Sequence, residues 1–505
     1  MPPFIDDSVV AQLKILLPIT VYRLASLGYV LSLVIYRIWF HPLSHFPGPK
    51  LLSALHLPYL YSSLVRGSWV RRMPKLHQRY GPIVRIAPNH LAIDGTLAWP
   101  EIYAHRPNNR PEFGRPAGLL FPGDHLCILG APREAHRRMR RQLAPAFSDG
   151  ALSEQGGDDH EIEAHAQEGN GIDIVEWLNF TAFDIVGDLA LGDSFHSLEN
   201  DAYLPWVRGI FTGIRGTQFA RFMGSYPVLR MLLGPLVSIR SIKAKDDNNM
   251  AAVQRTAVRI GQETEAESTS GPRDLVSYMM AKTRSGAPGM SEQEILATTS
   301  VLIIAGSETT GTALSGLFFY LARNPSAYEA LAREVRTAFP NESGISFRST
   351  APLEYLGACI DEALRVCPPA TETLPRISPG DFVNGQYIPR GTRISVYPWA
   401  TFRDPRNFSE PDTFLPQRWL SPAHPLYEER FSDDNRDAFK PFSFGSRDCL
   451  GKNLAYAEMR LIAARFIHRF DYELMPGQED WHDKQRMYLG WEKGPLKIRV
   501  RPRRL

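Results

Sequence analysis

Residues 442–451 read FSFGSRDCLG, and they decide the fold because they place Cys449 directly before a helix. The sequence that follows, LGKNLAYAEMRLIAARFIHRF, repeats apolar residues at helical spacing. Backbone N–H groups and the dipole at a helix N-terminus favour a sulfur anion, so the pattern predicts a lowered pKa for the Cys449 thiol and a strong metal ligand. The alternative is an inert cysteine buried in a glycine-rich turn.

The other fixed residues of this loop suit a cysteine that binds a flat metal cofactor. Gly445 and Gly451 permit a tight loop, Arg447 offers a carboxylate a planar fork of donors, and Phe442 can cover the sulfur. All five positions match FxxGxRxCxG, and on these residues the chain resembles the cytochrome P450 family. The resemblance implies a mainly α fold with small β-sheets. It also implies haem b, iron protoporphyrin IX, with Cys449 as the axial ligand of the iron.

A second motif of the family is the pair Glu362 and Arg365, which are three residues apart and therefore on one face of a predicted helix. In proteins at large, most such pairs are surface ion pairs worth about 0.2 to 0.5 kcal/mol. Here the segment FLPQRW supplies Arg418, which the resemblance places in a structural Glu–Arg–Arg cluster behind the cysteine loop. The family more often has Glu and Phe where Gln417 and Trp419 stand.

The longest apolar pattern in the chain begins after Ser291 and stops at Pro325. Ser291 is a predicted N-cap with Glu294 three residues later, which is the spacing of a capping box. The pattern predicts one helix of about nine turns.

Within that helix, AGSETT at residues 305–310 resembles the family's oxygen-activation motif. Small residues at Ala305 and Gly306 leave room for a haem beside the backbone. Thr309 can hydrogen-bond to a carbonyl one turn earlier and present its hydroxyl to dioxygen. Glu308 is the neighbouring proton source. Without Cys449, a Ser/Thr-rich patch in a core helix would be the preferred interpretation.

The run REAHRRMRRQLAPAF at residues 133–147 is predicted to be a helix rich in arginine. His136 and Arg140 lie on one face, where the family usually has Trp and Arg facing a haem propionate. Arg376 resembles the other propionate contact, so Arg140, Arg376 and Arg447 would together neutralise two carboxylates. The remaining arginines predict a solvated face or a docking face for a partner: Arg133, Arg137, Arg138 and Arg141.

Composition argues against nucleic-acid binding and against disulfide or metal sites formed by the other cysteines. The 57 basic and 54 acidic residues nearly balance, so no domain is basic enough to predict nucleic-acid binding. The other three cysteines, Cys127, Cys359 and Cys367, have no disulfide or metal spacing, which fits a reducing compartment.

The N-terminal region predicts a membrane anchor. The 22 residues from Ile15 to Tyr36 are long enough to cross a bilayer as a helix, and Arg23 is the only charge among them. A cleaved signal peptide is the rival, but acidic residues precede the apolar stretch and no small-residue cleavage site follows. Basic residues after the span favour a cytosolic catalytic domain and single-pass insertion in the endoplasmic reticulum membrane. We therefore expect an anchor at 1–40, a proline-rich hinge at 41–50 and a catalytic domain at 51–505.

Two segments alternate like strand pairs, namely 80–92 and 384–397, the latter with Gly391 at a turn. Residues 148–171 are acidic, rich in glycine and poor in apolar side chains. Similar proteins have a longer amphipathic helix in this position, and the sequence does not decide between a deletion and an error in the gene model.

Several stretches narrow the resemblance to fungal membrane-bound enzymes of secondary metabolism, of the trichothecene hydroxylase type: HPLSHFPGPK, NFTAFDIVGDLALGDSF, GMSEQEI and AGSETTG. It implies a monooxygenase that inserts one atom of dioxygen into a hydrophobic terpenoid or polyketide. The chain has no dinucleotide-binding fingerprint, so electrons would come from a separate NADPH-dependent reductase, with cytochrome b5 as a further partner.

Two other classes of function stay open at this stage. A haem-thiolate isomerase or dehydratase would not need Glu308 and Thr309, and neither would a non-catalytic haem protein. In the family, substrate specificity lies in five segments, and here they are mixed apolar with few charges: 106–127, 203–222, 243–261, the helix around Leu302, and 371–374.

Overall fold

The computed structural model describes residues 7–106, 110–116, 118, 123–147, 171–199, 205–226, 253–262, 274–282, 286 and 289–503. The acidic stretch 148–170 lies outside these residues, and so does most of the predicted specificity segment 243–261. The α-helices are α1 (Asp7–Ile35), α2 (Lys50–Ala54), α3 (Leu57–Leu60), α4 (Met73–Tyr80), α5 (Gly95–Ala98), α6 (Arg133–Leu143), α9 (Ile174–Leu191), α10 (Pro205–Gly224), α13 (Leu275–Met280), α14 (Glu292–Arg323), α15 (Pro325–Ala338), α16 (Glu354–Val366), α17 (Pro398–Thr401), α18 (Lys452–Arg469) and α19 (Trp481–Lys484). The strands are β1 (Ile83–Ala87), β2 (His90–Ile93), β3 (Ile172–Asp173), β4 (Arg376–Ile377), β5 (Asp381–Val383), β6 (Gln386–Ile388), β7 (Arg393–Ser395), β8 (Phe470–Leu474), β9 (Arg486–Met487), β10 (Trp491–Glu492) and β11 (Lys497–Pro502).

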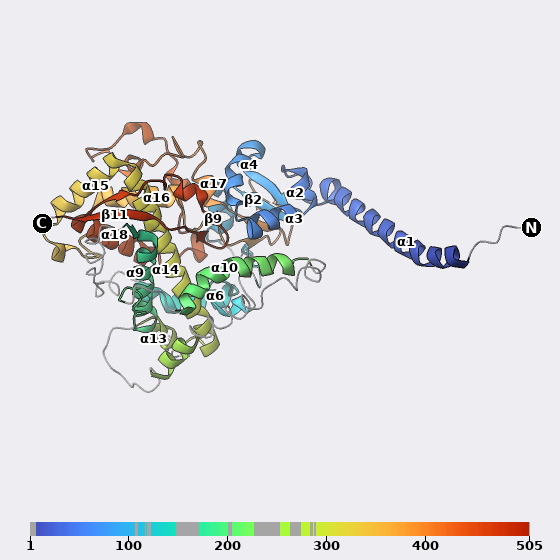
Figure 1. Ribbon diagram of the computed structural model, residues 1–505, viewed down its shortest axis with the longest axis horizontal. Helices are drawn as coiled ribbons and strands as arrows, with labels where there is room; N and C mark the ends of the chain where they lie inside the picture. The colour runs from blue at the N-terminus through green and yellow to red at the C-terminus, as the bar shows by residue number, and fades with distance from the viewer. Residues whose placement is uncertain are drawn as a thin grey trace, which may run out of the picture.

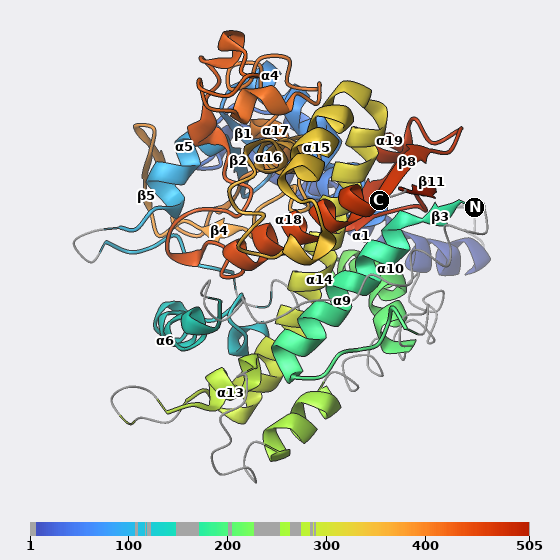
Figure 2. The same cartoon turned by 90° about the vertical axis from the view of Figure 1, so that its left-hand side faces the viewer.

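Helix α14 runs through the middle of the molecule (Figures 1 and 2). Its start is fixed by the predicted capping box: the Ser291 backbone N–H donates to Glu294 at 2.9 Å, and the Ser291 hydroxyl accepts from the Glu294 backbone N–H at 3.4 Å. Its C-terminal half packs with α15, α16 and α18 in the largest apolar cluster, and its N-terminal half joins α6 and α13 in a second cluster. The predicted single long helix is confirmed, and it ends one residue before Asn324.

The strands form small sheets, as predicted. The largest has four strands in the order β1-β2-β7-β4. The strand pair predicted at 80–92 is present, since β1 and β2 are antiparallel with Val84 opposite Ala92. The two strands and the turn predicted at 384–397 are present, but the strands, β6 and β7, do not pair with each other. Gly391 does lie in a turn with φ +83°, but β6 pairs with β5, whereas β7 pairs with β2 and β4.

Helix α1 extends from the body of the molecule (Figure 1), and a π-helical turn continues it through Phe40. Residues Leu16–Phe40 form a candidate membrane span with none of its apolar window buried. The helix is longer than the 15–36 stretch read from the sequence. Helix α14 is also long and apolar enough to cross a membrane, but it is mostly buried and belongs to the protein core.

The end of α1 is joined firmly to the rest of the protein. Arg37 donates to the carbonyl oxygen of Ala54 at 2.9 Å, and the carbonyl oxygen of Arg37 accepts from Arg85 at 2.8 Å. Within the predicted hinge at 41–50, Leu43 and Phe46 are buried in an apolar cluster with β1 and β2. This segment therefore packs against the body.

Candidate functional site

The loop before α18 holds Cys449 three residues ahead of the first helical residue. The Cys449 backbone N–H donates to the carbonyl oxygen of Phe442 at 2.9 Å, which closes the loop. Gly445 has φ +80°, and a Cβ there would lie 1.9 Å from the carbonyl oxygen of Tyr103, so only glycine fits. The need for Gly445 thus comes from neighbouring backbone. Gly451 has no such restriction, because a Cβ there would lie 3.7 Å from the Phe147 ring.

Among the four cysteines, Cys449 alone is exposed. The expectation of a lowered thiol pKa is wrong for the protein without a metal. Burial by the surrounding chain raises the pKa of Cys449, although the Gly451 N–H and the Arg140 charge act in the opposite direction. The thiol keeps some exposed surface, but the desolvation by nearby protein outweighs the helix terminus. Phe442 packs on the Tyr456 ring at 5.1 Å, on the helix that follows the loop.

A cavity of about 370 Å³ lies beside this loop, and four of the predicted cofactor residues line it: His136, Arg140, Arg376 and Arg447. Arg447 donates to the carbonyl oxygen of Ala131 at 2.9 Å and to Glu112 at 3.0 Å. Arg140 is held by Asp448, through its backbone carbonyl at 2.7 Å and through its carboxylate. Arg376 packs over the Tyr103 ring. The structure thus brings the predicted residues to one place.

The charges around this cavity are not balanced. Nε of Arg376 and Nε of Arg447 are buried without a hydrogen-bond partner in the described chain, and so are two guanidinium nitrogens of Arg115. Burial, followed by the charges of Arg447 and Arg140, lowers the pKa of His136 to about 3, so its imidazole is neutral. Buried donors without acceptors are costly, and they mark a place where an anionic group fits.

These features fit a haem. Its two carboxylates would satisfy the free guanidinium donors of Arg115, Arg376 and Arg447, and Cys449 would supply a sulfur ligand. Among the described residues no group of three or more His, Cys, Asp or Glu side chains could hold a metal ion. A metal at Cys449 therefore needs its remaining ligands from a prosthetic group.

On α14, Thr309 and Ala305 are exposed on the same face, one turn apart. The Thr309 hydroxyl donates to the carbonyl oxygen of Ala305 at 2.6 Å, which confirms the predicted back-bond. Gly306 faces elsewhere: a Cβ there would lie 2.9 Å from Val186 of α9. Packing between α9 and α14 therefore requires the glycine, and only Ala305 borders the open face.

Glu308 has surroundings that the sequence did not indicate. Its carboxylate is buried and forms an ion pair with Lys493 Nζ at 3.0 Å. The same ammonium group donates to the Thr312 hydroxyl at 2.8 Å and to Asn179 at 3.3 Å. The second carboxylate oxygen of Glu308 has no partner in the described chain. Glu308 and Thr309 are therefore adjacent in sequence but share no hydrogen bond.

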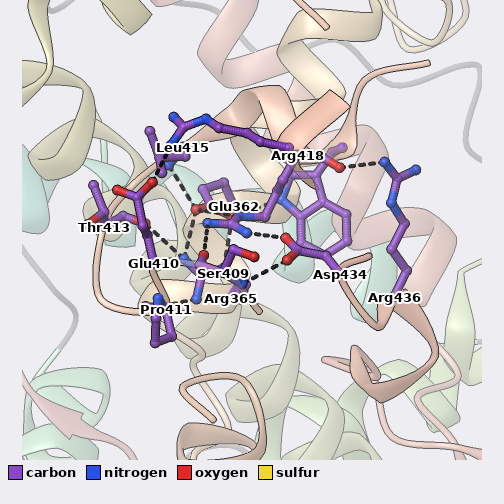
Figure 3. Close-up of polar contacts among 12 residues, drawn as sticks. Glu362, Arg365, Ser409, Glu410, Pro411, Thr413, Leu415, Arg418, Asp434 and Arg436 are labelled. Atoms are coloured by element: carbon purple, nitrogen blue, oxygen red, sulfur yellow. Dashed lines mark hydrogen bonds and ion pairs between the residues drawn. The ribbon is translucent and has the colours of Figure 1, made fainter. Parts of the chain in front are cut away.

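Behind the cysteine loop, Glu362 binds two arginines (Figure 3). Arg365 donates to its carboxylate through two nitrogens, at 2.7 and 2.9 Å, and Arg418 donates at 3.2 Å. All three side chains have no exposed surface. Burial alone would raise the pKa of Glu362, but the charges of Arg365 and Arg418 lower it. Removing one partner of such a buried cluster costs about 3 to 5 kcal/mol.

Two members of this cluster were missed from the sequence. Asp434 forms an ion pair with Arg418, and the indole N–H of Trp419 donates to Glu362 at 2.9 Å. Trp419 is one of the two residues that depart from the family pattern, and here it adds a hydrogen bond that a phenylalanine lacks. Arg115 and Lys493 were missed as well, because neither belongs to a recognisable motif.

Comparison with known proteins agrees with this geometry. The family model for cytochrome P450 matches residues 47–500. The chain is 37% identical to cytochrome P450 monooxygenase aclL of Aspergillus oryzae over 488 residues, which cover 94% of this chain and 96% of the relative. It is also 37% identical to trichothecene C-15 hydroxylase of Fusarium sporotrichioides, over 95% of this chain and 97% of the relative. Cytochrome P450 monooxygenase astA of Talaromyces wortmannii is 37% identical over 95% and 96%.

The matched span contains the cysteine loop, the buried Glu362 cluster, and Glu308 and Thr309 of α14. The expected resemblance, fold class and enzyme class are confirmed. The chain belongs to the cytochrome P450 family, and it is a haem-thiolate monooxygenase whose electrons come from a reductase.

Proposed function

We propose that the protein binds haem b through Cys449 and oxidises a hydrophobic secondary metabolite, a terpenoid or a polyketide. The observation that carries this proposal is the single exposed thiol beside a cavity with unpaired buried arginines. The Fusarium relative is a trichothecene C-15 hydroxylase, which supports the substrate class. We further propose that the electrons originate from NADPH and that cytochrome b5 is an additional donor.

A bound haem supplies the activation of dioxygen and the transfer of one oxygen atom to the substrate, while the other atom leaves as water. The sulfur of Cys449 would be the ligand from the protein, and Arg376 and Arg447 would bind the carboxylates together with Arg115. Because the imidazole of His136 is neutral, it can donate one ring N–H without adding to the positive charge of this cavity.

Proton delivery is assigned to Glu308 and Thr309. The Thr309 hydroxyl lies on the exposed face of α14 and can release its bond to Ala305 to donate a proton outward. Glu308 is behind it, and Lys493 holds one of its carboxylate oxygens. The ion pair orients that carboxylate, so that it can pass on protons that enter from the side of the C-terminal segment.

The reductase is proposed to dock on the exposed side of α6. Arg137 and Arg141 are exposed there. Arg138 is engaged by Glu294, and Arg133 lies 4.0 Å from Glu112. Arg137 forms an ion pair with Glu134 at 3.5 Å, but both of these side chains remain more than half exposed. The docking face predicted from four arginines therefore rests mainly on Arg137 and Arg141.

The location is proposed to be the endoplasmic reticulum membrane, with α1 as a single span and residues 51–505 as a cytosolic catalytic domain. The exposed apolar surface of α1 supports this placement. Basic residues after the span, including Arg37 and Lys50, support a cytosolic orientation.

Replacing Cys449 by Ala tests the carrying observation. The reduced carbon monoxide complex of the parent protein should have the spectrum of a thiolate-ligated haem, and Cys449→Ala should abolish it because no other cysteine is exposed. The matched control is Cys359→Ala, which removes a buried thiol from α16 and should keep the spectrum. A thiolate-type spectrum in the Cys449→Ala protein would overturn the assignment.

A further inference from the structure

A second cavity, of about 700 Å³, lies between α3 and α4 and takes no part in the chemistry described above. Four of its lining residues are cationic, and none is acidic: Arg66, Arg71, Arg72 and Lys75. Arg66, Arg72 and Lys75 are exposed, and none of them forms an ion pair within the described part of the chain. These three positive charges therefore have no counter-charge within the described part of the chain.

Arg71 gives the cavity a fixed cationic wall. Its guanidinium donates to the carbonyl oxygen of His482 at 2.6 Å and lies 5.3 Å from the ring centres of both Trp399 and Trp491. Its carboxylate partner, Asp483, lies 3.7 Å away and is mostly exposed. Nε of Arg71 is buried without a partner in the described chain. The Arg71 guanidinium is therefore fixed in position and keeps one N–H donor that an anion could accept.

The cavity lies next to the membrane span. Large apolar side chains between the end of α1 and the cavity are 42% to 73% exposed: Trp39, Phe40, Leu51, Leu57 and Tyr61. Tyr61 also lines the cavity. Exposed apolar and aromatic residues beside a membrane helix are typical of a surface that rests in the interface of a bilayer.

The sequence around the cavity also has an excess of basic over acidic residues. Residues 8–93 contain ten lysines and arginines and no aspartate or glutamate, although the whole chain is nearly balanced at 57 basic and 54 acidic residues. The cytosolic leaflet is anionic and attracts cations that lie within a Debye length of its surface.

We propose that the cavity between α3 and α4 binds the phosphate headgroup of an anionic phospholipid, with the acyl chains lying over Leu57 and Tyr61. This inference rests on the proposed insertion of α1 in a membrane. Phosphate matches the guanidinium groups of Arg66, Arg71 and Arg72 in charge and geometry. A phosphatidylcholine headgroup is neutral overall because its ammonium group balances its phosphate, whereas phosphatidylserine keeps a net negative charge that three arginines and a lysine attract.

The test uses the full chain in a neutral detergent, titrated with dioctanoyl phosphatidylserine, dioctanoyl phosphatidylcholine or inorganic phosphate. We expect phosphatidylserine to bind at least tenfold more tightly than phosphatidylcholine, and inorganic phosphate to bind weakly because it lacks acyl chains. The triple variant Arg66→Gln, Arg72→Gln, Lys75→Gln should lose this preference, since each neutralised cation near a membrane surface weakens binding by about fivefold. The control variant Arg333→Gln, Arg348→Gln, Arg390→Gln removes three exposed arginines elsewhere and should keep it.

Three results would overturn the proposal. Equal affinity for the two lipids would mean that the headgroup charge is not recognised. Phosphate as tight as the lipid would indicate a site for a free anion. An unchanged lipid preference in the triple variant, with a raised KM for the reductase, would assign the surface to a protein. Failure of α1 to insert is detected separately, because the full chain would then stay outside vesicles of phosphatidylcholine and of phosphatidylserine alike.

Discussion

Glu308 and Thr309 are neighbours in the chain but have separate surroundings. Thr309 shares an open face with Ala305, whereas Glu308 is buried against Lys493. Because the two side chains share no hydrogen bond, the roles proposed for them in proton delivery can be tested separately by mutation.

Replacing Thr309 by Val tests the hydroxyl. Valine keeps the shape of the side chain but cannot donate a proton, and positioned proton transfer contributes on the order of 10² to 10⁴ in rate. Product formed per NADPH consumed should fall roughly tenfold or more, with peroxide accounting for the missing oxygen. The ratio of product to NADPH and the amount of peroxide are measured with added reductase and a substrate that the parent enzyme oxidises.

The matched control for this experiment is Thr299→Val. Thr299 is buried on the same helix, and its hydroxyl has no partner among the described residues. This variant should keep the normal ratio of product to NADPH. Full coupling in Thr309→Val would remove Thr309 from the mechanism and leave Glu308 as the remaining residue.

Replacing Lys493 by Met tests the ion pair of Glu308. A buried carboxylate that loses its cation costs about 3 to 5 kcal/mol, and burial then favours its protonated form. In the folded Lys493→Met protein, Glu308 should stay protonated at pH values at which the glutamate of the unfolded chain has already released its proton. Stability should therefore be greatest at low pH and should fall as pH rises, as measured by thermal unfolding between pH 5 and 8.

The double variant Lys493→Met, Glu308→Gln is the control for the ion pair. It has no charge to bury, so it should recover much of the lost stability and its dependence on pH should match that of the parent protein. Equal losses in the single and double variants would show that Lys493 contributes through packing instead.

For single residues, the sequence predicts contacts within one helix but not contacts between distant segments. The bond from Thr309 to Ala305 follows from helical spacing alone. The partner of Glu308 lies 185 residues away, and Asp434 reaches Arg418 from an irregular loop, so no spacing rule indicates either contact. The raised pKa of Cys449 also depends on the protein that covers the loop.

At the scale of elements, a buried carboxyl group links α14 to α18. The Thr310 hydroxyl of α14 donates to Glu458 of α18 at 3.2 Å. Burial raises the pKa of Glu458 to about 8, and the hydrogen bond from Thr310 only partly opposes this. The folded state thus holds a proton that the unfolded chain releases near the ordinary glutamate pKa of 4.5.

The free energy of unfolding that Glu458 contributes should therefore fall as pH rises. A raised folded-state pKa gives stability that is complete below the unfolded pKa and is lost as pH rises through the folded one. Between pH 5.5 and 7.5 the parent protein should lose about 1.4 kcal/mol per pH unit relative to Glu458→Gln. Denaturant unfolding at the two pH values measures this difference.

The control for this pH dependence is Glu429→Gln. Glu429 is exposed, so its replacement should leave the loss of stability with pH unchanged. Parallel curves for the parent protein and Glu458→Gln would contradict a neutral Glu458.

Elements differ in how far sequence determines them. The capping box and Pro325 fix both ends of α14 locally, so its extent could be predicted. The pairing of the strands within 384–397 could not, because β7 pairs with β2, which lies far away in sequence, and with β4, which lies beyond β5 and β6. The motif glycines were located correctly, but Gly306 is required by Val186 and Gly445 by Tyr103. The motif therefore predicts where a glycine stands, whereas the packing of neighbouring residues explains why a glycine is required there.

At the scale of the whole molecule, the anchor can be tested by truncation. Deleting residues 1–35 removes α1 but keeps Arg37 and its bonds to Ala54 and Arg85. The truncated protein should move from the membrane fraction toward the soluble fraction after an alkaline wash, with nearly normal haem content, because α1 contributes no residue to the site.

Deleting residues 1–40 provides the comparison for this truncation. It also removes Arg37, so the buried guanidinium of Arg85 loses an acceptor and stability should fall by about 1 to 3 kcal/mol. Integral behaviour that survives the shorter deletion would show that α1 is not the anchor.

The bonds of Arg37 to Ala54 and of Arg85 to Arg37 also restrict motion. With α1 in a bilayer, they prevent the body from swinging on a loose tether, and Leu43 and Phe46 add to this restraint. The protein would then diffuse laterally at a constant tilt, and spinning about the membrane normal would be its main remaining freedom. The protein and an electron donor in the same bilayer would then meet by lateral diffusion and by rotation about one axis. Far fewer relative positions and orientations have to be sampled than for two proteins that tumble freely in solution.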